Sequence, residues 1–414
     1  MKIFHLSNSD IRGGAARAAN RLHQALLETG LKSQMLVNKK FSNDKTIYGP
    51  INVFEKLFIQ IRPRISNLLI KLFNTNNDIT HSISIFQSPW IDYINKSDVD
   101  IVHLHWVQNE MLSIADIGRI KKPIVWTLHD MWAFCGAEHL SQNNRWRLGY
   151  TKVNRPPNES GLDINRWTWK RKLNHWKKPI YIVTPSNWLA NCARESKLMR
   201  NWPISVVANL IDTNSWKPKD KKEEKKKFGI SPDIPLIIFG TYGANNNYNK
   251  GFDLFLETLE FLKDDTNLKK MEIIIYGKHK KNMPKTKFPI HYLGHLNDNN
   301  SLMNLYSAAD ATVVPSRQES FCQTASESHA CGTPVVGFNI GGLNDIVDHL
   351  RTGYLAKAFD AQDLAKGISW VVNENKKETL QRQARLQAVE KFSQKVLVQE
   401  YQKIYSKVLS NKDK

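Results

Sequence analysis

Two glutamates lie close together in the segment PSRQESFCQTASESHACGTPVV, residues 315–336. Glu319 and Glu327 have seven residues between them. The apolar run ATVVPS leads into the segment and predicts a strand, so Glu319 is expected at the carboxyl edge of a sheet, where doubly wound sheets bind ligands. Carboxylates are poor partners for phosphate and good acceptors for hydroxyl donors. The pair therefore suits the binding of vicinal hydroxyl groups.

The residues between the two glutamates indicate a helix start. Ser320 and Gln323 have the spacing of a capping box, which predicts that a helix begins near Phe321 and places Glu327 about two turns into it. A helix N-terminus offers free N–H groups and a partial positive charge to an anion. Hydroxyl acceptors around an anion site suit a sugar nucleotide. A capped helix with two incidental acids is the alternative.

Two loops that contain glycine also follow predicted strands. Gly13 and Gly14 come after KIFHLS and before an alanine-rich helix, and glycines let a backbone approach a ligand closely. This loop lacks G-x-G-x-x-G, so a dinucleotide fingerprint is not supported. Lys250 precedes Gly251 in GTYGANNNYNKG, where a lysine can neutralise a phosphate as a point charge. A tight turn and an ordinary surface lysine are the alternatives.

A histidine ends another predicted interior strand, in the segment TLHDMW. His129 at this edge could hydrogen-bond a substrate or move a proton, while Asp130 could instead tie it into the structure. Of the 12 tryptophans, most are expected in the core or in interfaces. Trp132 is the best candidate for stacking on a sugar, because it neighbours His129.

The elements that must position these residues alternate between strand and helix. Runs such as VDIVHLHWV, KPIVWTLHD and PLIIFG are short and rich in Val, Ile and Leu, which predicts parallel sheets covered on both faces. The alternation occurs twice in the 414 residues, before and after the Pro- and charge-rich stretch 209–235. We therefore predict an α/β fold with two Rossmann-like doubly wound domains. The expected limits are 1–210, 211–392 and a final helix over 393–414.

The composition restricts the classes of protein and partner. Hydrophobic residues make up 41%, and no apolar run reaches about 18 residues, so we expect no membrane-spanning helix. The N-terminus lacks the apolar core of a signal peptide, which favours the cytoplasm. The four cysteines have no metal-ligand spacing, so no metal site is expected. The net charge of +20 fits a lysine-rich exterior, an anionic membrane or phosphorylated ligands; no nucleic-acid motif accompanies it.

One segment departs from the alternation. Residues 51–74, INVFEKLFIQIRPRISNLLIKLFN, are apolar with four basic residues and one acid. Pro63 is expected to interrupt or kink a helix there. An amphipathic element at a membrane surface and a buried pair of helices are both compatible with this composition.

These motifs together resemble the retaining glycosyltransferases of family 4, with the GT-B architecture of two Rossmann-like domains that face each other across a cleft. The resemblance covers nearly the whole chain. It is carried by the Gly-Gly loop, TLHDMWAFCGAEH, PSNWLAN, NLIDTNSWKP, the Lys-Gly loop, PSRQESF…SE, GTPVVGFNIGG and TGYL. The two glutamates are its most diagnostic element. HLHW and TLHDMW are similar to members of the exopolysaccharide or colanic-acid type.

The resemblance implies a role for each candidate residue. Glu327 would bind the nucleotide ribose, and Lys250 would neutralise the diphosphate. Glu319 would contact the donor sugar and His129 would lie near the transferred sugar and the acceptor, which makes both catalytic candidates. The other implied positions are Gly13, Gly14, Ser320, Phe321, Cys322 and Gln323 for the donor, and Asp130 and Trp132 on the acceptor side.

The implied reaction is metal-independent transfer, with retention, from a nucleotide-diphosphate sugar to a lipid-linked or glycan acceptor in bacterial surface polysaccharide biosynthesis. Domain 1–210 would take the acceptor, domain 211–392 the donor, and the final helix would cross back to the first domain. No cofactor and no nucleic acid are expected, while contact with the anionic inner membrane is a further hypothesis. A nucleotide-sugar epimerase or hydrolase of the same architecture, and a non-catalytic protein that binds anionic polymers, remain alternatives.

Two positions depart from the family pattern. Ala244 stands where many members carry an arginine, so diphosphate binding would depend more on Lys250 or on another basic residue. Cys322 follows Glu-Ser-Phe where glycine is common. A positive φ there would strain a cysteine. We expect an ordinary helical N-terminus instead, with no strain.

Overall fold

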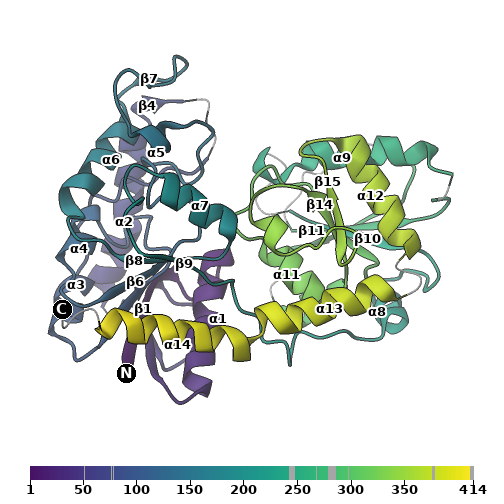
Figure 1. The fold of residues 1–414 in the computed structure, drawn as a ribbon, viewed down its shortest axis with the longest axis horizontal. Helices are drawn as coiled ribbons and strands as arrows, with labels where there is room; N and C mark the ends of the chain where they lie inside the picture. Colours follow the sequence, from purple (N-terminus) through teal and green to yellow (C-terminus); the bar gives the residue numbers. More distant parts are fainter. Residues whose placement is uncertain are drawn as a thin grey trace. The chain divides into compact units, whose positions relative to one another are not determined.

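The computed structural model describes residues 1–50, 52–75, 77, 79–241, 248–266, 268–277, 286–296, 298–374 and 378–410. The chain divides into two compact units, and Figure 1 shows both. The first unit comprises Met1–Ala208 with Val398–Lys414, and the second comprises Asn209–Leu397. The sequence predicted the two boundaries between these parts after residues 210 and 392. Ala244 lies outside the described residues.

In the described part of the first unit, seven parallel strands form a sheet in the order β3-β2-β1-β5-β6-β8-β9. They are β1 (Lys2–Ser9), β2 (Lys32–Lys39), β3 (Ile47–Tyr48), β5 (Ile101–Leu104), β6 (Ile124–Thr127), β8 (Tyr181–Thr184) and β9 (Ile204–Val206). The strand order changes direction between β1 and β5. This is the switch point at which such open sheets bind ligands.

Alternate residues along these strands face opposite sides of the sheet. Leu6 and Leu104 belong to the main apolar cluster of the first unit. His5 and His103 precede them and face the other side, where they are fully buried. The helices around the sheet are α1 (Gly14–Glu28), α2 (Val53–Ile70), α3 (Trp90–Lys96), α4 (Ile114–Arg119), α5 (Arg145–Leu148), α6 (Ile164–His175), α7 (Asn187–Glu195) and α14 (Gln394–Ser410).

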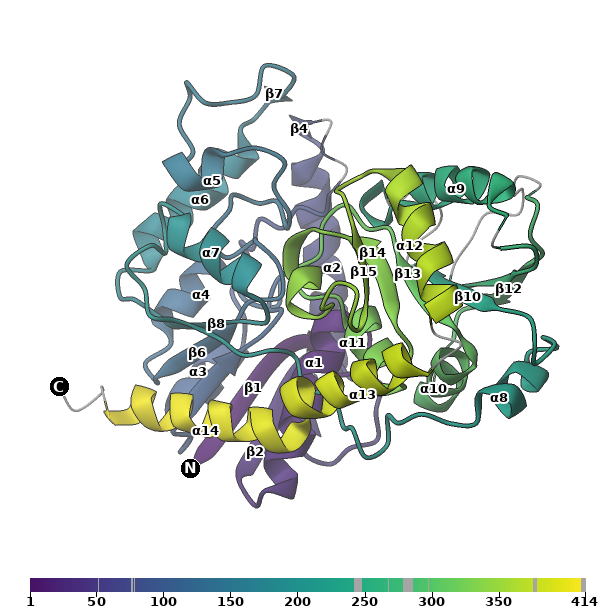
Figure 2. The same ribbon diagram turned by 45° about the vertical axis from the view of Figure 1, so that its right-hand side comes forward.

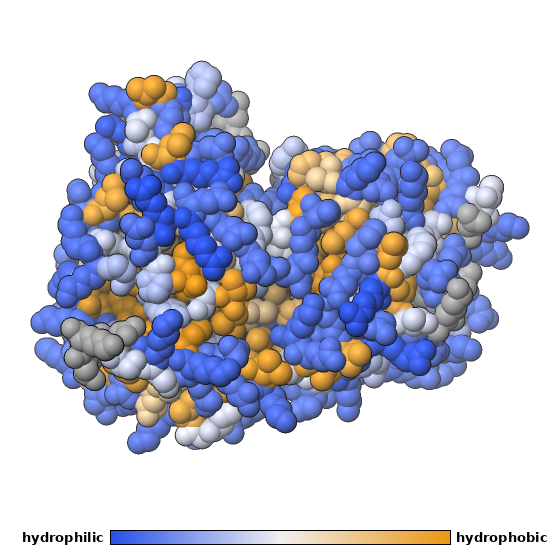
Figure 3. Space-filling model, viewed as in Figure 1, coloured by the Kyte–Doolittle hydropathy of each residue, from blue (hydrophilic) through white to orange (hydrophobic). Residues whose placement is uncertain are grey.

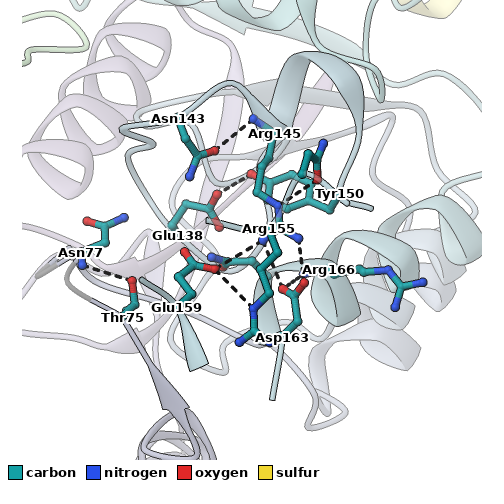
Figure 4. A network of polar contacts seen from close by, with 12 residues as sticks. Thr75, Asn77, Glu138, Asn143, Arg145, Tyr150, Arg155, Glu159, Asp163 and Arg166 are labelled. Atoms are coloured by element: carbon teal, nitrogen blue, oxygen red, sulfur yellow. Dashed lines mark hydrogen bonds and ion pairs between the residues drawn. The ribbon is translucent and has the colours of Figure 1, made fainter. Parts of the chain in front are cut away.

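A buried polar network fixes the connection between β6 and α6, and Figure 4 shows its side chains converging. Arg145 donates to both oxygens of Asp163, at 3.2 and 2.7 Å. Tyr150 donates a short hydrogen bond to Glu138. Burial raises the pKa of Glu138, although the Tyr150 hydroxyl opposes this rise. The Arg145–Asp163 pair neutralises the buried guanidinium charge within this long loop. A two-stranded antiparallel pair, β4 (Phe73–Asn74) with β7 (Ser160–Gly161), borders it.

The second unit repeats the architecture. Its described residues form six parallel strands in the order β12-β11-β10-β13-β14-β15, so its switch point lies between β10 and β13. The strands are β10 (Leu236–Thr241), β11 (Glu272–Gly277), β12 (Ile290–Gly294), β13 (Ala311–Val314), β14 (Val335–Phe338) and β15 (Gly353–Ala356). The predicted fold class of two Rossmann-like α/β domains is confirmed.

Helices cover both faces of the second sheet, as the two views in Figures 1 and 2 agree. One layer holds α9 (Phe252–Phe261) and α12 (Ala361–Glu374), which contact each other. The other layer contains α8 (Lys221–Lys227), α10 (Asn299–Ala308), α11 (Gln323–Ala330) and α13 (Thr379–Phe392). On the face drawn in Figure 3, hydrophilic residues predominate and apolar residues form smaller patches.

Most of the apolar segment 51–74 forms one continuous helix, Val53–Ile70, in place of an interrupted or paired one. Helix α2 continues across Pro63, and only Ile59, Arg62 and Ser66 of this helix are buried. The expectation of an interruption at Pro63 was therefore wrong, as was the alternative of a buried helical pair. Among the described residues, no helix is both long enough and apolar enough to span a bilayer.

Candidate functional site

Two loops meet at the switch point of the second sheet. Lys250 ends a short 3₁₀ helix, Tyr248–Lys250, in the connection after β10, and Glu319 lies in the loop after β13. Lys250 Nζ lies 2.6 Å from Glu319 Oε1. Gly251 makes this approach feasible. Its φ is +65°, and a Cβ there would lie 1.8 Å from the Pro315 carbonyl oxygen.

Further contacts hold the two loops together. The Arg317 amide donates to the Asn249 carbonyl at 2.8 Å, and the Asn249 side chain donates to the Gln318 carbonyl at 2.9 Å. The Arg317 guanidinium donates to both oxygens of Asp253, at 2.8 and 2.6 Å. Bidentate pairs of this kind fix direction as well as distance. The Lys250 ammonium is therefore carried on a braced loop.

Glu319 has a second partner and a close backbone support. Ser316 donates to the same Oε1 at 2.8 Å. The Gly342 amide donates to the Glu319 carbonyl, and a Cβ on Gly341 would come within 2.4 Å of that carbonyl oxygen. Burial lowers the pKa of Lys250, but the adjoining Glu319 carboxylate outweighs this effect, so the pKa is raised. Lys250 therefore stays cationic at neutral pH.

Helix α11 begins later than the capping box predicts. Its first residue is Gln323, and its N-cap is Cys322, which makes no side-chain capping bond. The predicted start near Phe321 was therefore wrong. Glu327 is the fifth residue of the helix, about one turn from its start in place of two.

Cys322 also corrects the expectation of an unstrained backbone. Its φ is +81° and its ψ is +78°, in the left-handed region that glycine adopts freely. The chain must turn sharply here, because Phe321 and Cys322 are both buried immediately before the helix. The glycine common in the family thus answers a real conformational need, which cysteine meets with strain.

We predict different effects for two substitutions at Cys322. Cys322→Gly should change the free energy of unfolding by less than about 1 kcal/mol, because relief of strain offsets the greater freedom of the unfolded chain. Cys322→Val should destabilise by about 2 kcal/mol or more, because a β-branched residue fits a positive φ poorly. Urea unfolding of both variants measures this. Equal midpoints for valine and glycine would show that the positive φ carries no cost.

Glu327 is buried, with 3% of its surface exposed. Tyr306 donates to its Oε2 at 3.4 Å, and the Tyr306 hydroxyl lies 3.0 Å from that of Tyr276. Burial raises the pKa of both tyrosines, and the carboxylate of Glu327 raises it further. The two phenols therefore stay protonated and can hold the carboxylate in place. Its contact with a ribose stays a prediction.

The Gly-Gly loop of the first unit opens α1. Gly13 is the N-cap with a φ of +96°, which requires glycine, whereas Gly14 is already helical. A Cβ on either residue would meet no atom within 4 Å. The open space beside both residues agrees with a loop that a ligand can approach, although their role in donor binding stays a prediction.

The TLHDMW segment does not expose Trp132 to a sugar, contrary to the prediction from the sequence. Asp130 accepts from the Trp132 amide and the Trp106 indole, both at 2.9 Å, and pairs with His139 at 2.6 Å. Asp130 therefore has structural partners, but these are Trp132, Trp106 and His139 in place of His129, and its acceptor-side role stays a prediction. Trp132 is 0% exposed and donates to the Ser82 carbonyl, so its ring face is not available to a sugar. The proposed stacking role of Trp132 was wrong.

His129 follows β6 at the carboxyl edge of the first sheet and is partly exposed. Its Nε2 lies 3.2 Å from His105 Nδ1. Burial lowers the pKa of His129 to about 4, against the opposing influence of Asp130. Three further histidines on the same face, His5, His103 and His105, were missed. For His103 and His105 the alternation in VHLHW contained the signal, because residues two apart share a face of a strand.

Known families match the chain in two consecutive parts. The family described as Glycosyltransferase Family 4 matches residues 12–215. The family described as Glycosyl transferases group 1 matches residues 220–387. The second match includes Lys250, Glu319 and Glu327.

Curated relatives share part of this length. A D-inositol 3-phosphate glycosyltransferase of Streptosporangium roseum is 36% identical over 183 residues, 41% of this chain and 42% of that protein. An N-acetyl-alpha-D-glucosaminyl L-malate synthase of Bacillus anthracis is 26% identical over 214 residues, 50% of this chain and 55% of that protein. The chain spans about half the length of the curated relatives that it matches.

Solved structures share the fold along the chain. A sucrose-phosphate synthase from Thermosynechococcus elongatus has a TM-score of 0.67 at 15% identity, covering 99% of this chain and 100% of that one. Anabaena HepE in complex with UDP-glucose has a TM-score of 0.64 at 14% identity, with the same coverage. These structures show that the fold is common to the whole length. The two glycosyltransferase family models match consecutive parts of the chain, so the chain belongs to the family 4 glycosyltransferases.

Proposed function

We propose that the protein transfers a sugar, with retention, from a nucleotide-diphosphate sugar to a lipid-linked or glycan acceptor. The observation that carries this proposal is the pairing of Lys250 with Glu319 beside the N-terminus of α11. A cation and a helix N-terminus suit a diphosphate, and carboxylates suit hydroxyl groups. Among solved relatives, HepE was crystallised with UDP-glucose, which supports a donor of this class.

In the proposed reaction, the second unit stabilises the leaving diphosphate. The Lys250 ammonium and the first turn of α11 are fixed before the donor arrives, so they need little reorganisation as negative charge develops. Glu319 then holds the donor sugar and Glu327 the ribose. Because Lys250 supplies the positive charge, we propose that transfer needs no metal ion.

The proposed function is tested by a donor screen with product analysis. Thermal unfolding of the full chain is followed with UDP-, GDP- and ADP-sugars, because a ligand that binds only the folded state raises the melting temperature. One nucleotide class should raise it, and the chosen donor should be consumed only when a glycan or lipid-linked acceptor is present. Release of free sugar or an epimer without acceptor would contradict transfer and favour the hydrolase or epimerase alternative.

We further propose that the acceptor lies at an anionic membrane, such as the inner face of the plasma membrane, and that α2 contacts that surface. Along α2 and the turn after it, large apolar side chains are exposed, among them Phe54 at 84%, Val53 at 78% and Leu68 at 62%. At about 100° per residue, residues 53, 54, 57, 58, 65, 68, 69 and 72 occupy one continuous stripe. The buried residues of α2 lie outside this stripe, with Arg62 next to its edge.

Charge complementarity favours a lipid surface as the occupant of this stripe. Arg64 and Lys71 fall at one border of it, and Lys56 lies further round on the same side. Helices with an apolar face and flanking basic residues bind anionic interfaces. Each basic residue near such a surface contributes about 1 kcal/mol.

We predict that Phe54→Ser/Phe58→Ser weakens binding to anionic vesicles by at least about tenfold, because each buried phenyl ring contributes about 1.5–3 kcal/mol. Sedimentation with phosphatidylglycerol vesicles at low salt measures the effect. The matched control is Val153→Ser, which removes an apolar side chain that is 97% exposed elsewhere in the same unit. If the unmodified protein does not sediment with the vesicles, the membrane proposal is contradicted, whereas the proposed transfer reaction is not affected.

A further inference from the structure

Four histidines lie together on one face of the first sheet. His5 on β1 and His103 on β5 are partners in the strand register. His105 lies two residues beyond His103 and so faces the same side. His129 follows β6 at the same edge. The first three are 0–2% exposed, a burial that is uncommon for histidine unless its ring is hydrogen-bonded.

Three of these rings form a linear chain. His5 Nδ1 lies 3.0 Å from His105 Nε2, and His105 Nδ1 lies 3.2 Å from His129 Nε2. His103 is satisfied separately, at 2.7 Å from the Tyr405 hydroxyl and 2.8 Å from the Thr127 hydroxyl. His105 is thus the middle member, with both of its nitrogens engaged by another histidine.

Neutral rings in such a chain cannot choose their tautomers independently. Burial lowers the pKa of His5 and His105 well below the ordinary value, so both are neutral at pH 7. A neutral imidazole has one N–H and one lone pair. His105 must therefore donate from one nitrogen and accept at the other. Either every N–H points outward, from His5 towards His129, or every N–H points inward.

The inner end of the chain decides the direction. His5 Nε2 is buried and has no hydrogen-bond partner among the described residues. The inward direction would place an N–H at this nitrogen, whereas the outward direction leaves only a lone pair there. Orphaned buried N–H groups are rarer in proteins than orphaned acceptors. The outward direction makes His129 accept at Nε2 and carry its proton on Nδ1.

We propose that the chain His5–His105–His129 holds His129 in the Nδ1–H tautomer, so that His129 offers its ligand a hydrogen-bond donor and no base. His5 and His105 are positioning residues. The consequence for catalysis rests on the proposed function. As the acceptor oxygen bonds to the sugar carbon and the carbon–phosphate oxygen bond breaks, the acceptor proton passes to the leaving phosphate oxygen and not to His129.

The groups that act on the histidine rings include a fifth histidine, two tyrosines and two carboxylates. His23 of α1 hydrogen-bonds Ser33 and Thr46, and its pKa is lowered to about 4 by burial. Tyr401 and Tyr405 of α14 face the sheet as neutral phenols, because burial raises the pKa of both. Two carboxylates act on these rings, Asp130 on His129 and Asp44 on His23. The histidine rings themselves remain neutral, because burial lowers the pKa of each.

A metal site is a poorer account of the same cluster. His5, His103 and His105 each have a ring nitrogen within 4.8 Å of the others. The rings of His103 and His105 are stacked, with centroids 4.3 Å apart and planes at 25°. An ion about 2.0 Å from each nitrogen must lie in both ring planes, which near-parallel stacked rings do not allow. Both nitrogens of His103 are also already engaged.

The test is nitrogen NMR of the full chain labelled with ¹⁵N-histidine at pH 7.5, where protonated and unprotonated ring nitrogens have separate shifts. His129→Gln identifies the His129 signals. We expect a protonated Nδ1 and a bare Nε2 in the unmodified protein, and a change to an Nε2–H or mixed state in His105→Phe. His105→Gln, whose amide can donate to Nε2, should restore the original state. If His105→Phe fails to fold, His5→Phe tests the same loss of direction.

Kinetics then separate this proposal from the proposed function. His105→Phe should lower kcat at least about tenfold, as wrong tautomers do, with little change in the KM for the donor. Three results would overturn the proposed hydrogen-bonded chain. The first is an Nε2–H form of His129 in the unmodified protein, and the second is an unchanged set of His129 signals in His105→Phe. The third is stoichiometric zinc in the unmodified protein that is lost in His103→Phe. Full activity of His129→Gln would instead remove the catalytic role of His129 and leave the tautomer result standing.

Discussion

Replacing Lys250 with alanine is expected to lower kcat/KM for sugar transfer by about 10²–10³-fold, the range seen when one preorganised donor to a developing anion is removed. Lys250 is the described cation that lies 2.6 Å from Glu319 beside α11. Without it, the leaving diphosphate would lose its nearest positive charge. Steady-state kinetics with the identified donor measure the effect.

Two controls belong with this substitution. Lys222→Ala removes an exposed lysine of α8 and should leave kcat/KM unchanged. Lys250→Ala also leaves Glu319 without its ion-pair partner, so its thermal unfolding must be compared with that of the unmodified protein. Wild-type rates in a folded Lys250→Ala protein would contradict the proposed position of the diphosphate.

Mild acid is expected to destabilise the protein strongly. The pKa of His23, His129 and His329 is lowered to about 4 and that of His103 to about 3, in each case chiefly by burial. The unfolded chain binds protons at these groups near pH 6.5, whereas the folded chain does not. Stability is therefore complete above about pH 7 and falls as pH drops towards about 4. Each group contributes up to roughly 3 kcal/mol.

Urea unfolding at pH 7.5, 6 and 5 measures this loss. The transition of the first unit should respond most, because it holds the cluster of His5, His23, His103 and His105. His23→Asn should lower the stability at pH 7.5, since the His23 ring bridges Ser33 and Thr46. It should also flatten the dependence on pH, because one buried titrating group is gone. A stability independent of pH between 7.5 and 5 would contradict the neutral histidine cluster.

Periodicity and loop position were enough to predict much of the second unit. Lys250 and Glu319 were each predicted to follow a strand, and both do. Their 2.6 Å contact was not predicted, because it depends on β10 lying beside β13, which only the structure shows. The fold class followed from the same alternation of short apolar runs and helices.

The failures arose where tertiary packing overrides a local pattern. Ser320 and Gln323 have the spacing of a capping box, but the turn at Cys322 starts α11 later. Trp132 neighbours His129 in sequence, yet its ring is buried beneath Lys172, whose Nζ lies 3.8 Å from the ring centroid. The spacing of residues in the sequence predicts neither the φ angle of a single residue nor the side chains that surround a single ring.

Helix α2 and the histidine chain are two further features that could not be predicted from the sequence. Proline usually breaks a helix because it lacks an N–H and crowds the preceding turn, yet α2 continues across Pro63. The histidine chain depends on which strands are neighbours. Until β1 is known to lie beside β5, His5 and His105 are distant in sequence and nothing indicates that their rings meet.

The central claim is that the second unit holds a diphosphate through Lys250, and calorimetric titration tests it most directly. Nucleoside mono- and diphosphates of the preferred base are titrated into the unmodified protein and into Lys250→Ala. We predict that the diphosphate binds at least about tenfold more tightly than the monophosphate in the unmodified protein, and that this ratio falls towards one in the variant. Equal ratios in the two proteins, or no binding of any diphosphate, would contradict the account.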